Sequence, residues 1–152
     1  MHRRLLLLAL AAFAPALGAQ TLPAKFDPAR DAEADVQLAL TLAREQRKLV
    51  FVDLGGEWCS WCHVFDRFVA ARPEVLRTLR ERYILVKVNY SPRNPNPALL
   101  SRWPKAKGYP HFYVLDADGR VLASQPSAEL EADNDYDEAR MLAFLRRHVP
   151  AS

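Results

Sequence analysis

The chain has 152 residues, of which 50% are hydrophobic and 26% charged, a composition typical of one globular domain and not of a disordered or fibrous protein. Its 21 basic and 18 acidic residues give a formal net charge of +3. Without Arg3 and Arg4 the count is 19 against 18, so the rest of the chain has no positive surplus that would favour nucleic acid as a partner.

The first 19 residues have the organisation of a secretory signal peptide. The basic start MHRR precedes the apolar run LLLLALAAFA, and the small residues of PALGAQ follow it. The apolar run is too short to span a bilayer, so we expect cleavage after Gly18 or Ala19, with an uncleaved anchor as the alternative. The sequence therefore predicts an exported, periplasmic protein with one domain over residues 20–152.

Helical and strand patterns alternate along the rest of the chain. Apolar residues that recur every three or four positions predict helices, and short apolar runs rich in β-branched and aromatic residues predict buried strands. Residues 21–26 are expected to be a tether, after which Asp27 and Pro28 suit a helix start. The expected elements are helices over 27–48, 59–72, 74–82 and 135–148, strands over 49–54 and 83–90, a hairpin over 111–124 and at most a short helix over 98–103.

This order predicts an α/β fold in which helices cover both faces of a central sheet. The closing hairpin, with Asp118-Gly119 as its turn, makes the sheet a mixed one. The acidic stretch over 129–138 is expected to be a solvated loop that leads into the last helix, because carboxylates favour a helix N-terminus. A calcium loop is the weaker alternative, since its glycine and its distal glutamate are missing.

Both cysteines of the chain lie in the segment EWCSWCH, at positions 59 and 62. A disulfide across so short a loop adds little stability, so the pair is better explained by chemistry than by structure. At the start of a helix, unpaired N–H groups and the helix dipole favour a thiolate. We therefore expect Cys59 to attack and Cys62, one turn further on, to resolve the mixed disulfide.

Three neighbours of the cysteines are candidate site residues. Trp58 and Trp61 are expected to shield the pair and to offer flat apolar surfaces to a substrate chain, with core packing as the alternative. His63 is expected to add positive charge beside the thiolates and so to tune their pKa, with a helix residue of no special role as the alternative.

The segment VDLGGEWCSWC resembles the active-site segment of the thioredoxin-like family, with a strand, an acidic residue, a tryptophan and Cys-x-x-Cys in register. The resemblance implies a thioredoxin fold, with a central mixed sheet flanked by helices and an extra N-terminal helix. The chain is most similar to exported members, which include the thiol-reducing domain of the bacterial inner-membrane electron transporter.

The resemblance also implies roles for residues outside the cysteine segment. Asp53 would be the buried carboxylate that relays a proton, and Lys87 in LVKVNY would lie near it. Pro110 in GYPHFYVLDADGRV would be the family's cis-proline, which lets the backbone of Tyr109 pair with an extended substrate. An ordinary trans proline at a strand start is the alternative for Pro110.

The activity implied is thiol–disulfide exchange on exported proteins, with reduction as the favoured direction. The Cys59–Cys62 pair would be the redox centre, with no other cofactor and no metal. Implied partners are exported proteins with thiols or disulfides and a membrane thiol electron donor, and we expect a monomer. Gly55 departs from the aromatic residue of many family members and is expected to leave that side of the site more open. The pair Ser60-Trp61 departs from the family's Gly-Pro and leaves the redox potential open.

Three other readings of the motif remain. Cys-x-x-Cys-His also fits a c-type haem, with His63 as proximal ligand and a distal ligand among Met141, His111 and His148. His111 is otherwise expected to be a packed strand residue. A zinc site would need a second cysteine pair, which the chain lacks. A thioredoxin-like module without enzymatic activity would bind its partner independently of Cys59.

Overall fold

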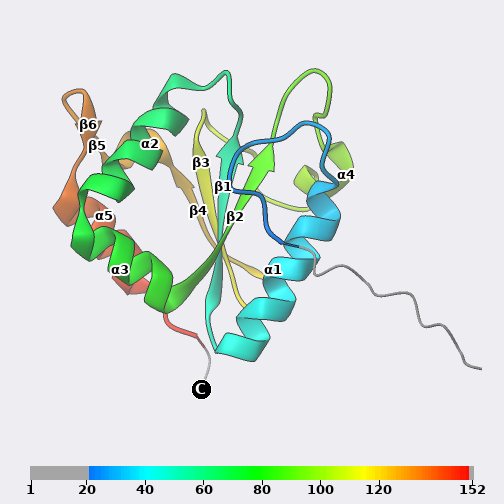
Figure 1. Cartoon of the computed structure of the whole chain (residues 1–152), viewed down its shortest axis with the longest axis horizontal. Helices are drawn as coiled ribbons and strands as arrows, with labels where there is room; N and C mark the ends of the chain where they lie inside the picture. Colours follow the sequence, from blue (N-terminus) through cyan, green and yellow to red (C-terminus); the bar gives the residue numbers. More distant parts are fainter. Residues whose placement is uncertain (1–20, 151–152) are drawn as a thin grey trace, which may run out of the picture.

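A computed structural model describes residues 21–150, so the predicted signal peptide lies outside the described residues. A four-stranded sheet in the order β2-β1-β3-β4 forms the centre (Figure 1). The strands are β1 (Leu49–Gly55), β2 (Tyr83–Asn89), β3 (His111–Leu115) and β4 (Val121–Pro126). β1 runs parallel to β2 and antiparallel to β3, and β3 pairs with β4 as a hairpin. The predicted mixed α/β sheet is confirmed.

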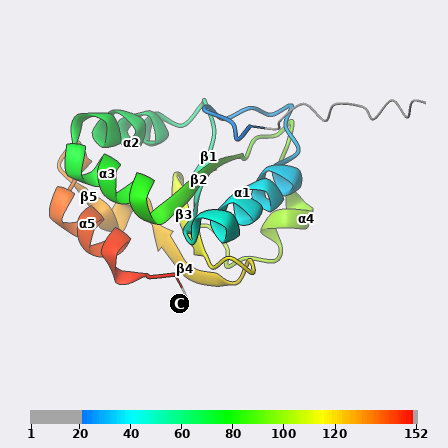
Figure 2. The same cartoon turned by 60° about the horizontal axis from the view of Figure 1, so that its bottom comes forward.

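Helices cover both faces of this sheet, as Figures 1 and 2 show. One layer contains α1 (Ala32–Gln46) and the short α4 (Pro97–Leu100), and the other contains α2 (Ser60–Ala71), α3 (Pro73–Arg82) and α5 (Glu138–Arg147). The predicted extra helix before the first strand is α1, and the predicted break at Pro73 separates α2 from α3. Within residues 21–150, no helix has both the length and the apolar character needed to cross a membrane.

Side chains along β1 alternate between the two faces of the sheet. From Leu49 to Leu54, the even-numbered apolar residues pack with α1 and the odd-numbered ones pack with α2, α3 and α5. Successive strand side chains point to opposite faces, so Asp53 falls on the α2 side. The register pairs Asp53 with Lys87 of β2, whose side chain shares that face by the same alternation.

The start of α1 differs from the prediction. The helix begins at Ala32 and not at residue 27, because Asp31 is its N-cap and its side chain accepts a hydrogen bond from the N–H of Ala34. Asp27 instead stabilises a turn before the helix, where its carboxylate accepts from the N–H of Ala29. Both aspartates are good capping residues, and tertiary contacts select the second.

The acidic stretch over 129–138 is not the solvated loop that the sequence predicts. A 3₁₀ turn (Ser127–Leu130) leads into a small hairpin of β5 (Glu131–Ala132) and β6 (Asp135–Tyr136), and α5 then starts at Glu138. Tyr136 is the cause, because its ring is buried against Phe65 and Phe68 of α2. One aromatic anchor therefore orders a stretch whose charges suggested a mobile surface.

Candidate active site

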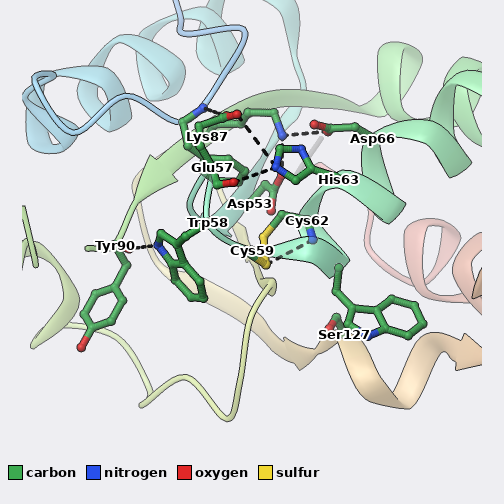
Figure 3. Close-up of a disulfide and its surroundings, with 12 residues drawn as sticks. Asp53, Glu57, Trp58, Cys59, Cys62, His63, Asp66, Lys87, Tyr90 and Ser127 are labelled. Atoms are coloured by element: carbon green, nitrogen blue, oxygen red, sulfur yellow. Dashed lines mark hydrogen bonds and ion pairs between the residues drawn. A yellow bond between two sulfur atoms is a disulfide. The ribbon is translucent and has the colours of Figure 1, made fainter. Parts of the chain in front are cut away.

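The two cysteines meet at the N-terminus of α2. Cys59 is the N-cap of the helix and Cys62 lies in its first turn, and the two form a disulfide (Figure 3). The backbone N–H of Cys62 also donates a hydrogen bond to Cys59 Sγ over 3.2 Å. Both residues are buried. Cys59 thus occupies the position at which a helix best stabilises a thiolate.

Two glycines before the helix make room for these groups. A Cβ atom on Gly55 would collide with Cys62 Sγ, and one on Gly56 would collide with the Trp58 indole. The departure from the family pattern at position 55 therefore has a steric reason, because β1 passes too close to the sulfur for a side chain.

Two linked ion pairs, Asp53–Lys87 and Lys87–Asp66, form an ion-pair chain beside the disulfide (Figure 3). Lys87 Nζ donates to Asp53 Oδ2 and to Asp66 Oδ1, both at 2.8 Å. Asp53 is fully buried, and its Oδ1 has no hydrogen-bond partner among residues 21–150. The Asp66 side chain is 48% exposed. Lys87 therefore links a buried carboxyl to one in contact with solvent.

Burial and charge shift the pKa values of Asp53 and Lys87 in opposite directions. Desolvation raises the pKa of Asp53 to about 6, although the attraction of Lys87 opposes the shift. Burial alone would lower the pKa of Lys87, but the Asp53 and Asp66 carboxylates outweigh it and the net direction is upward. The ammonium therefore stays charged while the Asp53 carboxyl can take up or release a proton near neutral pH.

One exposed and two half-buried aromatic side chains lie near the disulfide. Trp58 is 56% exposed, and its Nε1–H donates to the backbone oxygen of Tyr90 over 2.8 Å. The Tyr109 ring lies edge-on to the Trp58 ring at 5.4 Å and stacks on the Tyr90 ring at 5.0 Å. The Tyr109–Pro110 peptide bond is cis, and Tyr109 packs against both cysteines. The structure thus brings Trp58 and Tyr109 together beside the cysteines, and the buried Pro110 follows Tyr109 in the chain.

Trp61 and His63 are the other two candidate site residues next to the cysteines. Trp61 is half-buried and lies edge-on to Tyr136 at 5.6 Å, so much of its surface serves packing. His63 Nε2–H donates to the backbone oxygen of Glu57 over 2.8 Å, and its ring turns toward that residue and not toward a sulfur (Figure 3).

His111 is a buried strand residue that fixes the loop before Pro110. Its Nδ1 accepts from the N–H of Lys107 over 3.3 Å, so Nε2 carries the proton and donates to Ser124 Oγ over 2.8 Å. Burial lowers the pKa of His111 to about 4. The neutral imidazole is therefore the form that holds the loop carrying Tyr109 and Pro110.

Acid should weaken the protein through His111. A pKa below the ordinary value of 6.5 means that the folded state binds this proton less well, so stability is lost as the pH falls from about 6.5 toward 4. We expect His111→Leu to cost stability at about pH 7.5, and this deficit to shrink by roughly 2 kcal/mol at about pH 4.5. Urea unfolding at both pH values measures it, and a deficit that does not change with pH would contradict it.

The other residues considered as haem ligands are engaged in packing. Met141 is fully buried in the core between the sheet and α5, and the His148 ring lies edge-on to Phe144. In the part of the chain that the structure describes, no group of three or more His, Cys, Asp or Glu residues is arranged to hold a metal ion.

Comparison with known proteins identifies the family. Residues 31–117 match the thioredoxin-like family, over more than half of the chain. The chain belongs to the thioredoxin-like family. With its Cys59–Cys62 disulfide it is a thiol–disulfide oxidoreductase of that family.

This thioredoxin-like chain is 32% identical over 116 residues to the thiol:disulfide interchange protein DsbD of Pseudomonas fluorescens. The match covers 75% of this chain but only 18% of that longer protein. Two solved structures support the thioredoxin fold. A disulphide isomerase from Xylella fastidiosa Temecula1 has a TM-score of 0.67 at 22% identity, covering 84% of this chain and 96% of that one. The oxidised C-terminal domain of Neisseria meningitidis DsbD has 0.54 at 21%, covering 77% and 97%.

Two residues of this thioredoxin-like site escape the sequence analysis. Asp66 lies four positions after Cys62, a spacing that places both on one face of α2 and could have revealed it. Phe26 lies in the predicted tether, yet it is buried in a cluster with Cys59 and Cys62. The tether prediction is therefore wrong for Phe26, and no periodic pattern in the sequence signals this contact.

Proposed function

We propose that the chain is a thiol–disulfide reductase for exported proteins, with Cys59 as the attacking residue. One observation carries the proposal: the disulfide sits at a helix N-terminus beside a fully buried carboxyl that titrates near neutral pH. A disulfide kept only for stability would need no proton acceptor of this kind.

The exchange has two steps. The Cys59 thiolate attacks one sulfur of a client disulfide, so an S–S bond to Cys59 forms, the client bond breaks, and the released client thiolate takes a proton from solvent. Cys62 then gives its thiol proton to Asp53 and attacks Cys59 Sγ, which breaks the mixed disulfide and releases the second client sulfur as a thiolate that takes a proton from solvent. Two electrons pass from the dithiol to the client, and the protein ends in the disulfide form seen here.

Asp53 acts in this scheme as a general base for Cys62 and, in the reverse direction, as a general acid. Its pKa of about 6 lets it hold the proton only transiently at neutral pH. The Lys87 ammonium then balances the charge of the Asp53 carboxylate and is itself paired with Asp66, which is in contact with solvent.

The charge of Asp53 supports reduction as the proposed direction of electron flow. A buried carboxylate near Cys62 opposes the formation of a second negative charge there, and the disulfide carries none. This environment favours the oxidised form, so the dithiol tends to give its electrons away. The similarity to DsbD, a thiol:disulfide interchange protein, supports the exchange chemistry.

The client would bind on the aromatic side of the site. Trp58 offers an exposed ring, and the backbone of Tyr109 beside Pro110 is available to an extended chain. Trp61 would contribute the rim of this surface. His63 remains a candidate for tuning the thiolate only through its charge, since its ring is bonded to Glu57.

The partners and the location are proposed with the activity. Repeated turnover needs a dithiol donor, for which a membrane thiol transporter is the proposed partner. The pattern of the first 19 residues supports export to the periplasm, with residues 20–152 as the working domain and no nucleic acid or metal involved. We propose that this domain acts as a monomer.

The equilibrium potential of the Cys59–Cys62 pair against glutathione tests the proposed direction. A reductase should give a value of about −270 mV, similar to thioredoxin. A value near −120 mV would mark a strong oxidant and overturn the direction, though not the exchange chemistry.

A further inference from the structure

One side chain of the segment before α1 is buried while its neighbours are exposed. Phe26 is 4% exposed, whereas Lys25, Asp27 and Pro28 lie at the surface. The segment crosses the end of the sheet where β1 leads into α2 (blue in Figures 1 and 2). Burying a phenylalanine from an otherwise exposed segment indicates an anchored contact and not a passing one.

The Phe26 ring fills the space between the cysteines and the ion-pair chain. It faces Lys87, with Nζ 4.3 Å from the ring centroid, and belongs to the cluster of Cys59 and Cys62. A Cβ on Gly55 would lie 3.3 Å from its Cζ atom. Lys87 thus has the ring as a third neighbour beside its two carboxylate partners, at a distance where cation–π attraction is strong.

The segment is held at several points. The Phe26 N–H donates to Glu57 Oε1 over 3.0 Å, next to the cysteines. Asn94 Nδ2 donates to the backbone oxygens of Pro28 and Arg30, both at 3.1 Å. Arg30 in turn donates to the backbone oxygen of Thr21 over 3.0 Å and pairs with Asp35. Residues 21–30 therefore form a closed loop clipped at both ends.

We propose that residues 21–30 are a strap that closes the buried side of the redox site, and that Phe26 is the positioning residue that keeps water from Lys87 and Asp53. The inference rests on the proposed function, because it assigns the strap a part in the proton transfer between Cys62 and Asp53. The strap acts through the environment of the carboxyl.

The strap acts on the desolvation of the Asp53 carboxyl. The titratable and charged groups that face Asp53 are Lys87 from β2, Asp66 and Cys62 from α2, and Tyr136 from β6. Burial is the main cause of the raised pKa of Asp53, and the Phe26 ring would add to it by covering Lys87, which is bonded to that carboxyl. Without the ring, water reaches Lys87 and then the carboxylate, which becomes a weaker base for Cys62.

The test compares three single variants of the full chain in its oxidised form. Carbon-13 NMR follows the Asp53 carboxyl across its titration. Phe26→Ala should lower the titration midpoint by about one pH unit, because the carboxylate gains water. Phe26→Leu keeps an apolar side chain and should restore most of the wild-type midpoint. Lys25→Ala, an exposed change in the same segment, should leave it unchanged.

Asn94→Ala provides a second route if Phe26→Ala does not fold. It releases the strap from the neighbouring loop while leaving the ring, and should shift the midpoint in the same direction by a smaller amount. An unchanged midpoint in Phe26→Ala, or equal shifts in Phe26→Ala and Phe26→Leu, would overturn the proposal that the strap keeps water from Asp53. If instead the wild-type protein exchanges no disulfides, the proposed function fails, while the NMR comparison still decides the strap.

Discussion

Cys59→Ser is expected to abolish disulfide exchange, lowering the rate by several orders of magnitude, because the remaining sulfur, Cys62, is fully buried. Cys62→Ser should behave differently. Its Cys59 can still attack a client, but no thiol remains to resolve the product, so a mixed disulfide should accumulate. Non-reducing electrophoresis and mass spectrometry of the protein recovered with its client distinguish the two.

Ser60→Ala is the matched control, because it alters an exposed residue between the two cysteines. It should retain exchange within a few-fold of wild type. A thioredoxin-like module without enzymatic activity makes the opposite prediction: Cys59→Ser would keep both partner binding and the cellular effect. That outcome, or a client trapped through Cys62 in place of Cys59, would remove the basis for the proposed roles.

Asp53→Asn is expected to make the protein more stable and less active at the same time. The folded-state pKa of about 6 lies above the ordinary value of 3.8, so the native state binds this proton more tightly than the unfolded state. Stability is therefore present at low pH and is lost as the pH rises through about 6. The amide avoids that loss, and we expect a gain of about 1–3 kcal/mol near pH 8 that fades toward pH 4.

Exchange should slow by roughly 10²-fold in the same variant near neutral pH, because Cys62 loses its proton acceptor. Asp66→Asn is the control: it also removes a carboxylate from Lys87, but from a half-exposed position, and should change stability by less than about 1 kcal/mol. Urea unfolding at two pH values and the rate of client reduction provide the measurements. An Asp53→Asn variant that loses stability at both pH values would show that the carboxylate is a structural partner of Lys87 and not a base that burial destabilises.

Helix and strand boundaries were predictable wherever local chemistry decides them. The proline at position 73 cannot continue α2, and the turn at Asp118-Gly119 connects two strands of regular pattern. Prediction failed where two equally good signals competed or where a distant contact intervened. Asp27 and Asp31 are both capping residues, and the burial of Tyr136 orders a hairpin within a charged stretch.

The residues of the candidate site also differ in how far the sequence could predict them. Cys59, Cys62 and Trp58 are adjacent in the chain, so a short motif reveals them. Asp53 and Lys87 are 34 positions apart and could be paired only through the family resemblance, which the parallel register of β1 and β2 bears out. Phe26 had no such guide, because a single aromatic residue in an irregular segment carries no periodicity.

The sequence by itself determined the alternation of helices and strands, the dithiol at a helix start and the family, because each depends on residues close together in the chain. Only the tertiary structure decided that Asp53 is desolvated, that Lys87 joins it to Asp66, and that the Phe26 ring lies over Lys87. These properties depend on what lies within a few ångströms in space, and burial of a charge is a property of that whole surrounding and not of any one residue.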